Sequence, residues 1–240
     1  MRSAIHFLTI VLFIFSCTQG KRSAGYENLI YNSGYIENRD AIVVKGHEEV
    51  LHYNIKKNAV IADIGSGTGW LEGYFAIAYD SLIIYAEDID KKSLKSLPIV
   101  IEKYATHDQT PAKNTYHYVL GETTKSNLPD NYFDKIIVRE TFHHFEDKDA
   151  MLRDLHSKLK CDGSLCVYEP HVEQKTYSEL CQTYLLNKEE IFTHFERNDF
   201  ILMDEIHLIG NPGNVPPWIN LGSHEISQKV IYTFRKKTGC

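Results

Sequence analysis

Apolar and polar residues follow two alternating periods along most of this chain. Short apolar runs rich in β-branched residues predict strands at 59–64, 81–87, 116–120, 135–139, 164–168, 200–209 and 229–235. Apolar positions spaced three and four apart predict helices at 70–79, 91–105, 147–160 and 187–198. Because strands and helices alternate regularly, the pattern predicts an α/β fold with a mainly parallel sheet covered on both faces.

The last two predicted strands break this alternation. The segment between them has no helical pattern and is rich in Gly and Pro from Gly210 to Pro217. A parallel partner would need a longer crossover, so these strands are expected to pair as an antiparallel hairpin at the end of the sheet.

The N-terminal residues 1–24 are predicted to be a leader rather than part of the fold. Arg2 precedes an apolar run from Ile5 to Phe15, which is shorter than the about 20 residues of a spanning helix and suits a secretory signal. The following Ser16-Cys17 resembles the lipobox of bacterial lipoproteins. This resemblance implies lipidation at Cys17, a tether up to Ala24 and attachment to a membrane of the bacterial cell envelope. The alternative is an apolar leader on a cytoplasmic protein.

Residues 25–240 are expected to form one domain. The segment 25–55 reads as an N-terminal cap with a helix at 41–53, and the 43% hydrophobic and 24% charged content suits a single core. A net charge of −6 with scattered basic residues argues against a general nucleic-acid binder.

The cysteines show none of the CxxC spacing of zinc or thioredoxin-like sites. Cys166 lies in a predicted buried strand and is expected to be a packed free thiol, although a disulfide with Cys161 stays open. No metal site is predicted, because Glu140 and His143 have helical spacing but no third ligand is fixed.

The segment Asp63-Ile-Gly-Ser-Gly-Thr-Gly69 joins the first predicted strand to the first helix. Its three alternate glycines permit left-handed backbone angles and close approach of a ligand. A dinucleotide-binding loop would need its third glycine where this chain has Trp70, and Asp63 would repel a pyrophosphate. The loop therefore favours a cationic ligand over NAD, which argues against an NAD-dependent oxidoreductase.

This segment resembles motif I of the class I S-adenosylmethionine-dependent methyltransferases. The resemblance extends from about Arg39 to Arg235, and its first part, Arg39 to Leu51, looks like the helix that precedes motif I in a bacterial branch of the family. It implies a Rossmann-like, doubly wound, mainly parallel seven-stranded sheet with an antiparallel C-terminal hairpin. S-adenosyl-L-methionine is the implied cofactor.

The resemblance also implies which residues hold the cofactor. Asp88 ends the second strand at the position of the ribose-binding acid, Ile89 would lie against the adenine, and Glu122 stands where the family usually has Asp. The alternatives are a solvated strand end for Asp88 and an ordinary exposed turn residue for Glu122. The predicted cofactor-binding residues are Asp63, Gly65, Ser66, Gly67, Gly69, Asp88, Ile89, Glu122 and Arg139.

His143 and His144 follow the fourth strand, in the loop that faces the methyl group in this family. Imidazole suits a general base, and a methyl acceptor that loses a proton needs one. Both histidines are candidate catalytic residues, and the alternative is that one packs or bonds a backbone carbonyl. Tyr177, Tyr184 and Phe192 are expected in the core.

The leading hypothesis is methyl transfer to an unidentified small-molecule or lipid-like acceptor, with catalysis mainly by proximity and desolvation. The second hypothesis is a non-catalytic, membrane-anchored lipoprotein that retains the fold as a binding or scaffold module. It is motivated by Cys17, because lipidation would separate the domain from cytosolic cofactor.

Overall fold

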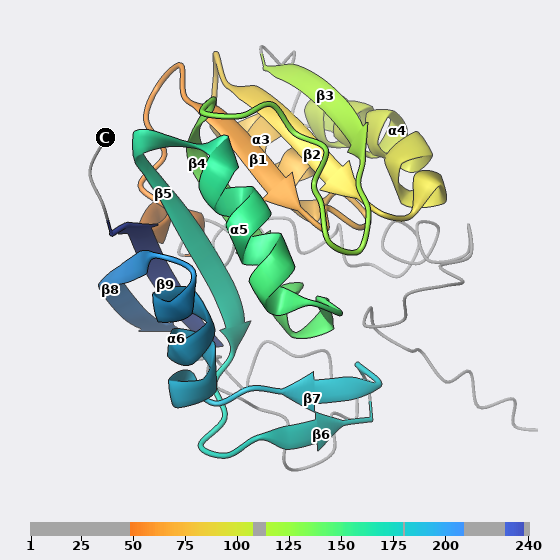
Figure 1. Ribbon diagram of the computed structural model, residues 1–240. Helices are drawn as coiled ribbons and strands as arrows, with labels where there is room; N and C mark the ends of the chain where they lie inside the picture. Colours follow the sequence, from red (N-terminus) through yellow and green to blue (C-terminus); the bar gives the residue numbers. More distant parts are fainter. Residues whose placement is uncertain (1–48, 108–113, 180, 209–228, 238–240) are drawn as a thin grey trace, which may run out of the picture.

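The structure is a computed structural model and describes residues 49–107, 114–179, 181–208 and 229–237 (Figure 1). The predicted leader, Cys17 and most of the predicted cap lie outside the described residues. Residues 49–52 are helical, which agrees with the end of the predicted helix at 41–53. Within these described ranges, none of the helices has the length and apolar character needed to cross a bilayer.

A seven-stranded sheet forms the centre of the molecule (Figure 1). Its strand order is β3-β2-β1-β4-β5-β9-β8, with parallel pairing from β3 to β5 and antiparallel pairing of β9 with both β5 and β8. The strands are β1 (Val60–Ile64), β2 (Ile83–Asp88), β3 (Thr115–Leu120), β4 (Phe133–Arg139), β5 (Leu159–Pro170), β8 (Phe200–Leu208) and β9 (Lys229–Lys236). The predicted fold class and C-terminal hairpin are confirmed.

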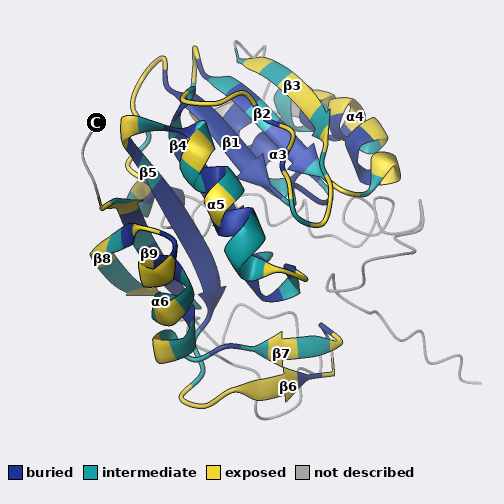
Figure 2. Cartoon of the chain, in the orientation of Figure 1, coloured by how far each residue is buried: buried dark blue, intermediate teal, exposed yellow. Residues whose placement is uncertain are grey.

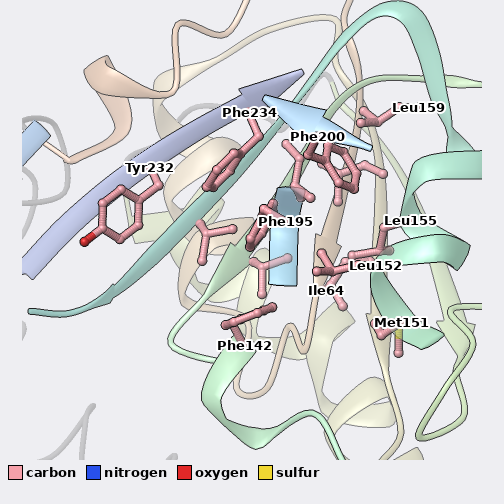
Figure 3. Close-up of a cluster of buried hydrophobic side chains, with 14 of the residues drawn as sticks. Ile64, Phe142, Met151, Leu152, Leu155, Leu159, Phe195, Phe200, Tyr232 and Phe234 are labelled. Carbon is pink, nitrogen blue, oxygen red and sulfur yellow. The ribbon is translucent and has the colours of Figure 1, made fainter. Parts of the chain in front are cut away.

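Helices cover both faces of this sheet. The helices are α3 (Trp70–Ala78), α4 (Lys91–His107), α5 (Lys148–Lys158) and α6 (Lys188–Arg197). Residues of α5 and α6 pack with aromatic residues of β8 and β9 in the larger apolar cluster, where Phe195 stacks on Phe234 at 3.7 Å (Figure 3). Residues of α3 and α4 pack on the other face. Buried β1 and most of β5 lie between these layers (Figure 2).

The polar residues at the ends of two helices explain where they begin. Asn187 and Glu190 form a reciprocal capping box at the start of α6, and the Asp147 side chain accepts from the backbone of Ala150 in α5. These caps satisfy amides that have no partner within the helix.

A small hairpin beyond the carboxyl end of β5 was not predicted. It consists of β6 (Thr176–Ser178) and β7 (Thr183–Leu185), and both strands include exposed residues (Figure 2). The expectation that Tyr177 and Tyr184 lie in the core is wrong, because they are 43% and 53% exposed and pack on each other at 5.2 Å. Phe192 does pack against the larger apolar cluster, as expected.

Candidate active site

The glycine loop follows β1 at the carboxyl edge of the parallel strands. Gly65, Gly67 and Gly69 all have positive φ, of 73°, 56° and 80°. These angles are strained for residues with a Cβ, which explains the three alternate glycines. A Cβ on Gly65 would lie 2.4 Å from Thr141 Cγ2, so this turn packs directly against the loop that follows β4.

Carboxyl groups surround this loop. The Asp88 carboxylate accepts from the backbone N–H of Gly67 at 2.8 Å and from that of Asp90 at 2.7 Å. The backbone N–H groups of Gly65 and Ser66 both donate to the carbonyl of Glu87 at 2.9 Å. The Asp88 carboxylate and the Glu87 backbone carbonyl of β2 thus hold the amides of the loop in place at the end of two adjacent strands.

Several buried polar atoms at the loop have no hydrogen-bond partner in the described part of the chain. They include Asp63 Oδ1, Ser66 Oγ and Glu87 Oε1. Burial raises the pKa of Asp63 to about 7 and that of Glu87 well above its usual range. Buried polar groups are normally satisfied, so these atoms indicate a place for a polar or cationic ligand.

Arg139 ends β4 beside the loop and connects it to the N-terminal helical residues. Its guanidinium lies 4.3 Å from the centre of the Trp70 ring and 5.0 Å from that of Tyr168. It also makes two hydrogen bonds to Glu49, at 2.7 and 3.1 Å. The arginine therefore lies against two aromatic rings and is bound by the Glu49 carboxylate.

Glu140 extends this network toward β9. It contacts Arg139 at 3.2 Å and also forms an ion pair with Lys229. Burial opposes its ionisation, but Lys229 and Arg139 outweigh that effect and hold the pKa of Glu140 at about 2. The positive φ of 51° at Glu140 shows that the backbone bends sharply where β4 ends.

The two candidate histidines lie in the short 3₁₀ helix η1 (Phe142–His144). His143 is only 2% exposed, and its Nδ1 pairs with Glu169 of β5. The second oxygen of Glu169 accepts from the backbone N–H of Phe142 at 2.9 Å. His144 is only half-buried, and its ring centre lies 4.2 Å from that of His143.

His143, His144 and Cys181 bring potential metal-ligand atoms within 4.8 Å of one another. However, Cys181 is disulfide-bonded and does not offer a thiolate, so the three residues do not form a metal site in this state. Cys161 is also disulfide-bonded, whereas Cys166 is a buried free thiol. The expected packed thiol at Cys166 is confirmed, and its pairing with Cys161 is excluded.

Two predicted cofactor residues lie at the ends of β2 and β3. Ile89 is 38% exposed, which leaves an apolar surface beside the loop. Glu122 is exposed in the turn after β3, and its carboxylate accepts from Asn127 at 3.3 Å. The fold thus brings the ends of β1, β2, β3 and β4 to one edge, as the predicted site requires.

Similarity to known proteins agrees with this arrangement. The family described as a methyltransferase domain matches residues 62–167. The structure of phosphoethanolamine N-methyltransferase 2 from Haemonchus contortus, with phosphomonomethylethanolamine and S-adenosylhomocysteine, superposes with a TM-score of 0.55. That comparison covers 77% of this chain and 50% of the other at 17% identity. This chain has a methyltransferase fold.

Two curated methyltransferases show how far the sequence similarity reaches. Phosphoethanolamine N-methyltransferase 1 from Zea mays is 25% identical over 73% of this chain and 31% of its own length. The ubiquinone/menaquinone biosynthesis C-methyltransferase UbiE from Vibrio cholerae is 32% identical over 45% of this chain and 40% of its own. The chain spans about a third of the length of the phosphoethanolamine methyltransferases that it matches.

Glu72 and Glu49 were missed by the sequence-based prediction. Glu72 lies three, four and seven residues before Phe75, Ala76 and Tyr79, so helical spacing places it on the apolar face of α3. A glutamate at an apolar position of a predicted helix is the sequence signal that could have identified Glu72. The pairing of Glu49 with Arg139 joins residues 90 positions apart, and no local pattern indicates it.

Proposed function

We propose that this protein is an S-adenosylmethionine-dependent methyltransferase acting on a small-molecule acceptor. The observation that carries the proposal is the glycine loop of positive φ enclosed by Asp63, Glu87 and Asp88. Such an acidic loop suits a cofactor that carries an ammonium and a sulfonium group, and it would repel the pyrophosphate of a dinucleotide. The methyltransferase family match at residues 62–167 supports the same function.

The residues present fit this cofactor. The loop glycines let the backbone approach a ligand closely, and buried Asp63 and Ser66 offer polar atoms that lack partners in the described residues. Asp63 would face the methionine end, Asp88 would accept from the ribose hydroxyls, and Ile89 would contact the adenine. When bound, the cofactor supplies an electrophilic methyl group on its sulfonium.

We assign the acceptor side of the reaction to the loop that follows β4. In this proposal His144 would take a proton from the acceptor, because it is more exposed than His143, which is buried and paired with Glu169. The relatives that act on phosphoethanolamine or in quinone biosynthesis support a small acceptor of this kind. The first assay is therefore methyl-label transfer to phosphoethanolamine, and then to lysate and membrane extracts.

Replacing Asp88 by alanine is expected to weaken binding of S-adenosylhomocysteine by at least about tenfold, because a hydrogen-bonded carboxylate is lost. Isothermal titration calorimetry on the purified protein measures the effect. Asp90→Ala is the matched control, since Asp90 instead accepts from Lys92 N and Ser93 Oγ in α4. This variant should lower stability more than affinity.

Absence of binding by the wild-type protein at millimolar ligand would contradict the proposed function. Binding without methyl transfer to any acceptor would favour the non-catalytic alternative.

We also propose, from the lipobox-like sequence, that the domain is anchored to a membrane of the bacterial cell envelope through lipidated Cys17. Expression of the full chain with labelled fatty acid should give a labelled, membrane-associated protein. Cys17→Ser should abolish both the label and the association. An unlabelled wild-type protein that fractionates with the cytoplasm would contradict the proposal and favour the cytoplasmic alternative.

A further inference from the structure

Glu72 is a buried acid for which the proposed function has no role so far. It lies in the first turn of α3 and is 0% exposed. No donor group in the described part of the chain forms a hydrogen bond to either of its carboxyl oxygens. Its carboxyl group lies within hydrogen-bonding reach of that of Asp63, which is 3% exposed at the end of β1. Two ionised carboxylates are both acceptors, so a hydrogen bond between them requires a proton on one of them.

The surroundings decide which carboxyl keeps that proton. Burial, followed by the charge of Asp63, raises the pKa of Glu72 well above its usual range. Its own backbone amide favours a charged carboxylate, but burial outweighs that effect. The pKa of Asp63 rises only to about 7, because its hydrogen bond to Glu72 and the charge of Arg139 oppose burial. Glu72, which is fully buried and has no donor, is therefore the carboxyl that favours the neutral form, whereas the charge of Arg139 favours ionisation of Asp63.

The other charged and titratable groups around the pair come from every neighbouring element. Acids from β2 and from the N-terminal helical residues favour the protonated state, and Arg139 of β4 opposes it. The Tyr116 hydroxyl donates to the backbone carbonyl of Glu72 rather than to its carboxyl group. The groups that face the pair are Glu49, Glu87, Asp88, Tyr116, Tyr118 and Arg139.

We propose that Glu72 is a positioning residue for the cofactor, which as a neutral carboxylic acid donates a hydrogen bond to Asp63 and orients that carboxylate toward the cationic methionine end. The inference rests on the proposed function, because it assigns Asp63 to the same ligand. This inference explains why an acid lies on the apolar face of α3. A neutral carboxylic acid there supplies a hydrogen-bond donor to Asp63 without adding a charge. It also keeps a second negative charge out of the core.

Two variants separate the donor from the charge. Glu72→Gln keeps a donor of the same size, and its affinity for S-adenosylhomocysteine at pH 8 should stay within about twofold of wild type. Glu72→Met keeps the size and helix propensity but removes the donor, and affinity should fall about tenfold at pH 8 because a charge-assisted hydrogen bond is lost. Both variants should fold, since neither buries a new unsatisfied charge.

The pH dependence of binding distinguishes orientation from a general structural effect. Without the donor, the pKa of Asp63 should rise, so the pH below which affinity declines should be higher in Glu72→Met than in wild type. The α-amino group of the ligand titrates equally with all three proteins, so the difference isolates Asp63. Equal affinities and profiles for Glu72→Met and wild type would overturn the inference. Equal losses in both variants would also overturn it, because they would show that a carboxylate charge is needed.

A spectroscopic measurement tests the protonation state without the cofactor. Infrared spectra at pH 8 should show the carbonyl stretch of a buried, protonated carboxylic acid in wild type that is missing in Glu72→Gln. Identical spectra in this region would overturn the inference even if binding is normal. Absence of ligand binding together with the expected infrared difference would instead refute the proposed function and keep Glu72 as a proton donor to Asp63.

Discussion

Replacing Gly65 by alanine is expected to weaken binding of S-adenosylhomocysteine by about 100-fold, equivalent to about 2.7 kcal/mol. The new Cβ would lie 2.4 Å from Thr141 Cγ2 and 2.6 Å from Thr141 Oγ1, and the backbone there has a φ of +73°. An alanine in this left-handed region costs about 1–2 kcal/mol even without a clash. The turn must therefore move, and the loop amides and Asp63 would no longer face the ligand together.

Two further variants show which cause dominates. Gly69→Ala places a Cβ on a backbone with an equally unfavourable φ of +80°, but this Cβ would clash with the flexible end of the Leu97 side chain rather than with Thr141. Its effect on affinity should therefore be smaller. Gly65→Ala combined with Thr141→Gly should recover part of the lost affinity by removing the clash while keeping the backbone strain. Calorimetric titration gives the affinities, and thermal unfolding separates them from loss of fold. Wild-type affinity of Gly65→Ala would show that the loop is not the cofactor site.

The strands were predictable because their burial follows from local sequence. The run from Val60 to Ile64 is apolar and β-branched, and all five residues of β1 are buried. The length of β5 was underestimated, since β5 begins at Leu159 and not near residue 164. Its first part includes polar Lys160 and Asp162, and it is extended by the pairing of Leu159 with Phe133 across a register shift in β4. Such pairing depends on the neighbouring strand and not on local periodicity.

The candidate site was predictable where it follows from strand ends and glycines. Parallel strands place their carboxyl ends at one edge, so Asp63 and Asp88 converge even though they are 25 positions apart in the sequence. The partners of the site residues were not predictable in the same way. Glu72 for Asp63, Glu49 for Arg139 and Glu169 for His143 all come from other elements, and only packing brings them together.

These partners give the two sides of the site different electrostatics. On the side proposed for the cofactor, the described acids near Asp63 exceed the nearby bases, because Arg139 is already bound to Glu49 and Glu140. On the β9 side, Glu140 and Lys229 neutralise each other. The acidic side therefore suits a cation. On the β9 side, the charges of Glu140 and Lys229 cancel, so this pair adds little net charge near His144.

Replacing His144 by alanine is expected to lower kcat by about 10²–10⁴-fold for an acceptor that loses a proton during transfer, which is the usual contribution of a general base. Affinity for S-adenosylhomocysteine should stay near wild type, because the loop contacts of Gly65 and Asp88 do not involve His144. Single-turnover transfer of labelled methyl groups separates this chemical step from binding. The pH profile should also lose its acidic limb, where a histidine base becomes protonated.

The neighbouring pair of His143 and Glu169 provides the matched control. Glu169→Gln keeps an oxygen that can accept from Phe142 N, but its amide would donate to His143 Nδ1 and change the tautomer of that ring. If His143 only positions η1, this variant should lower kcat less than His144→Ala and keep the acidic limb of the profile. A larger loss in Glu169→Gln, with unchanged folding and cofactor affinity, would contradict the assignment and make His143 the base. Because the two rings are adjacent and His143 is paired with the buried carboxylate of Glu169, the two variants should give clearly different profiles.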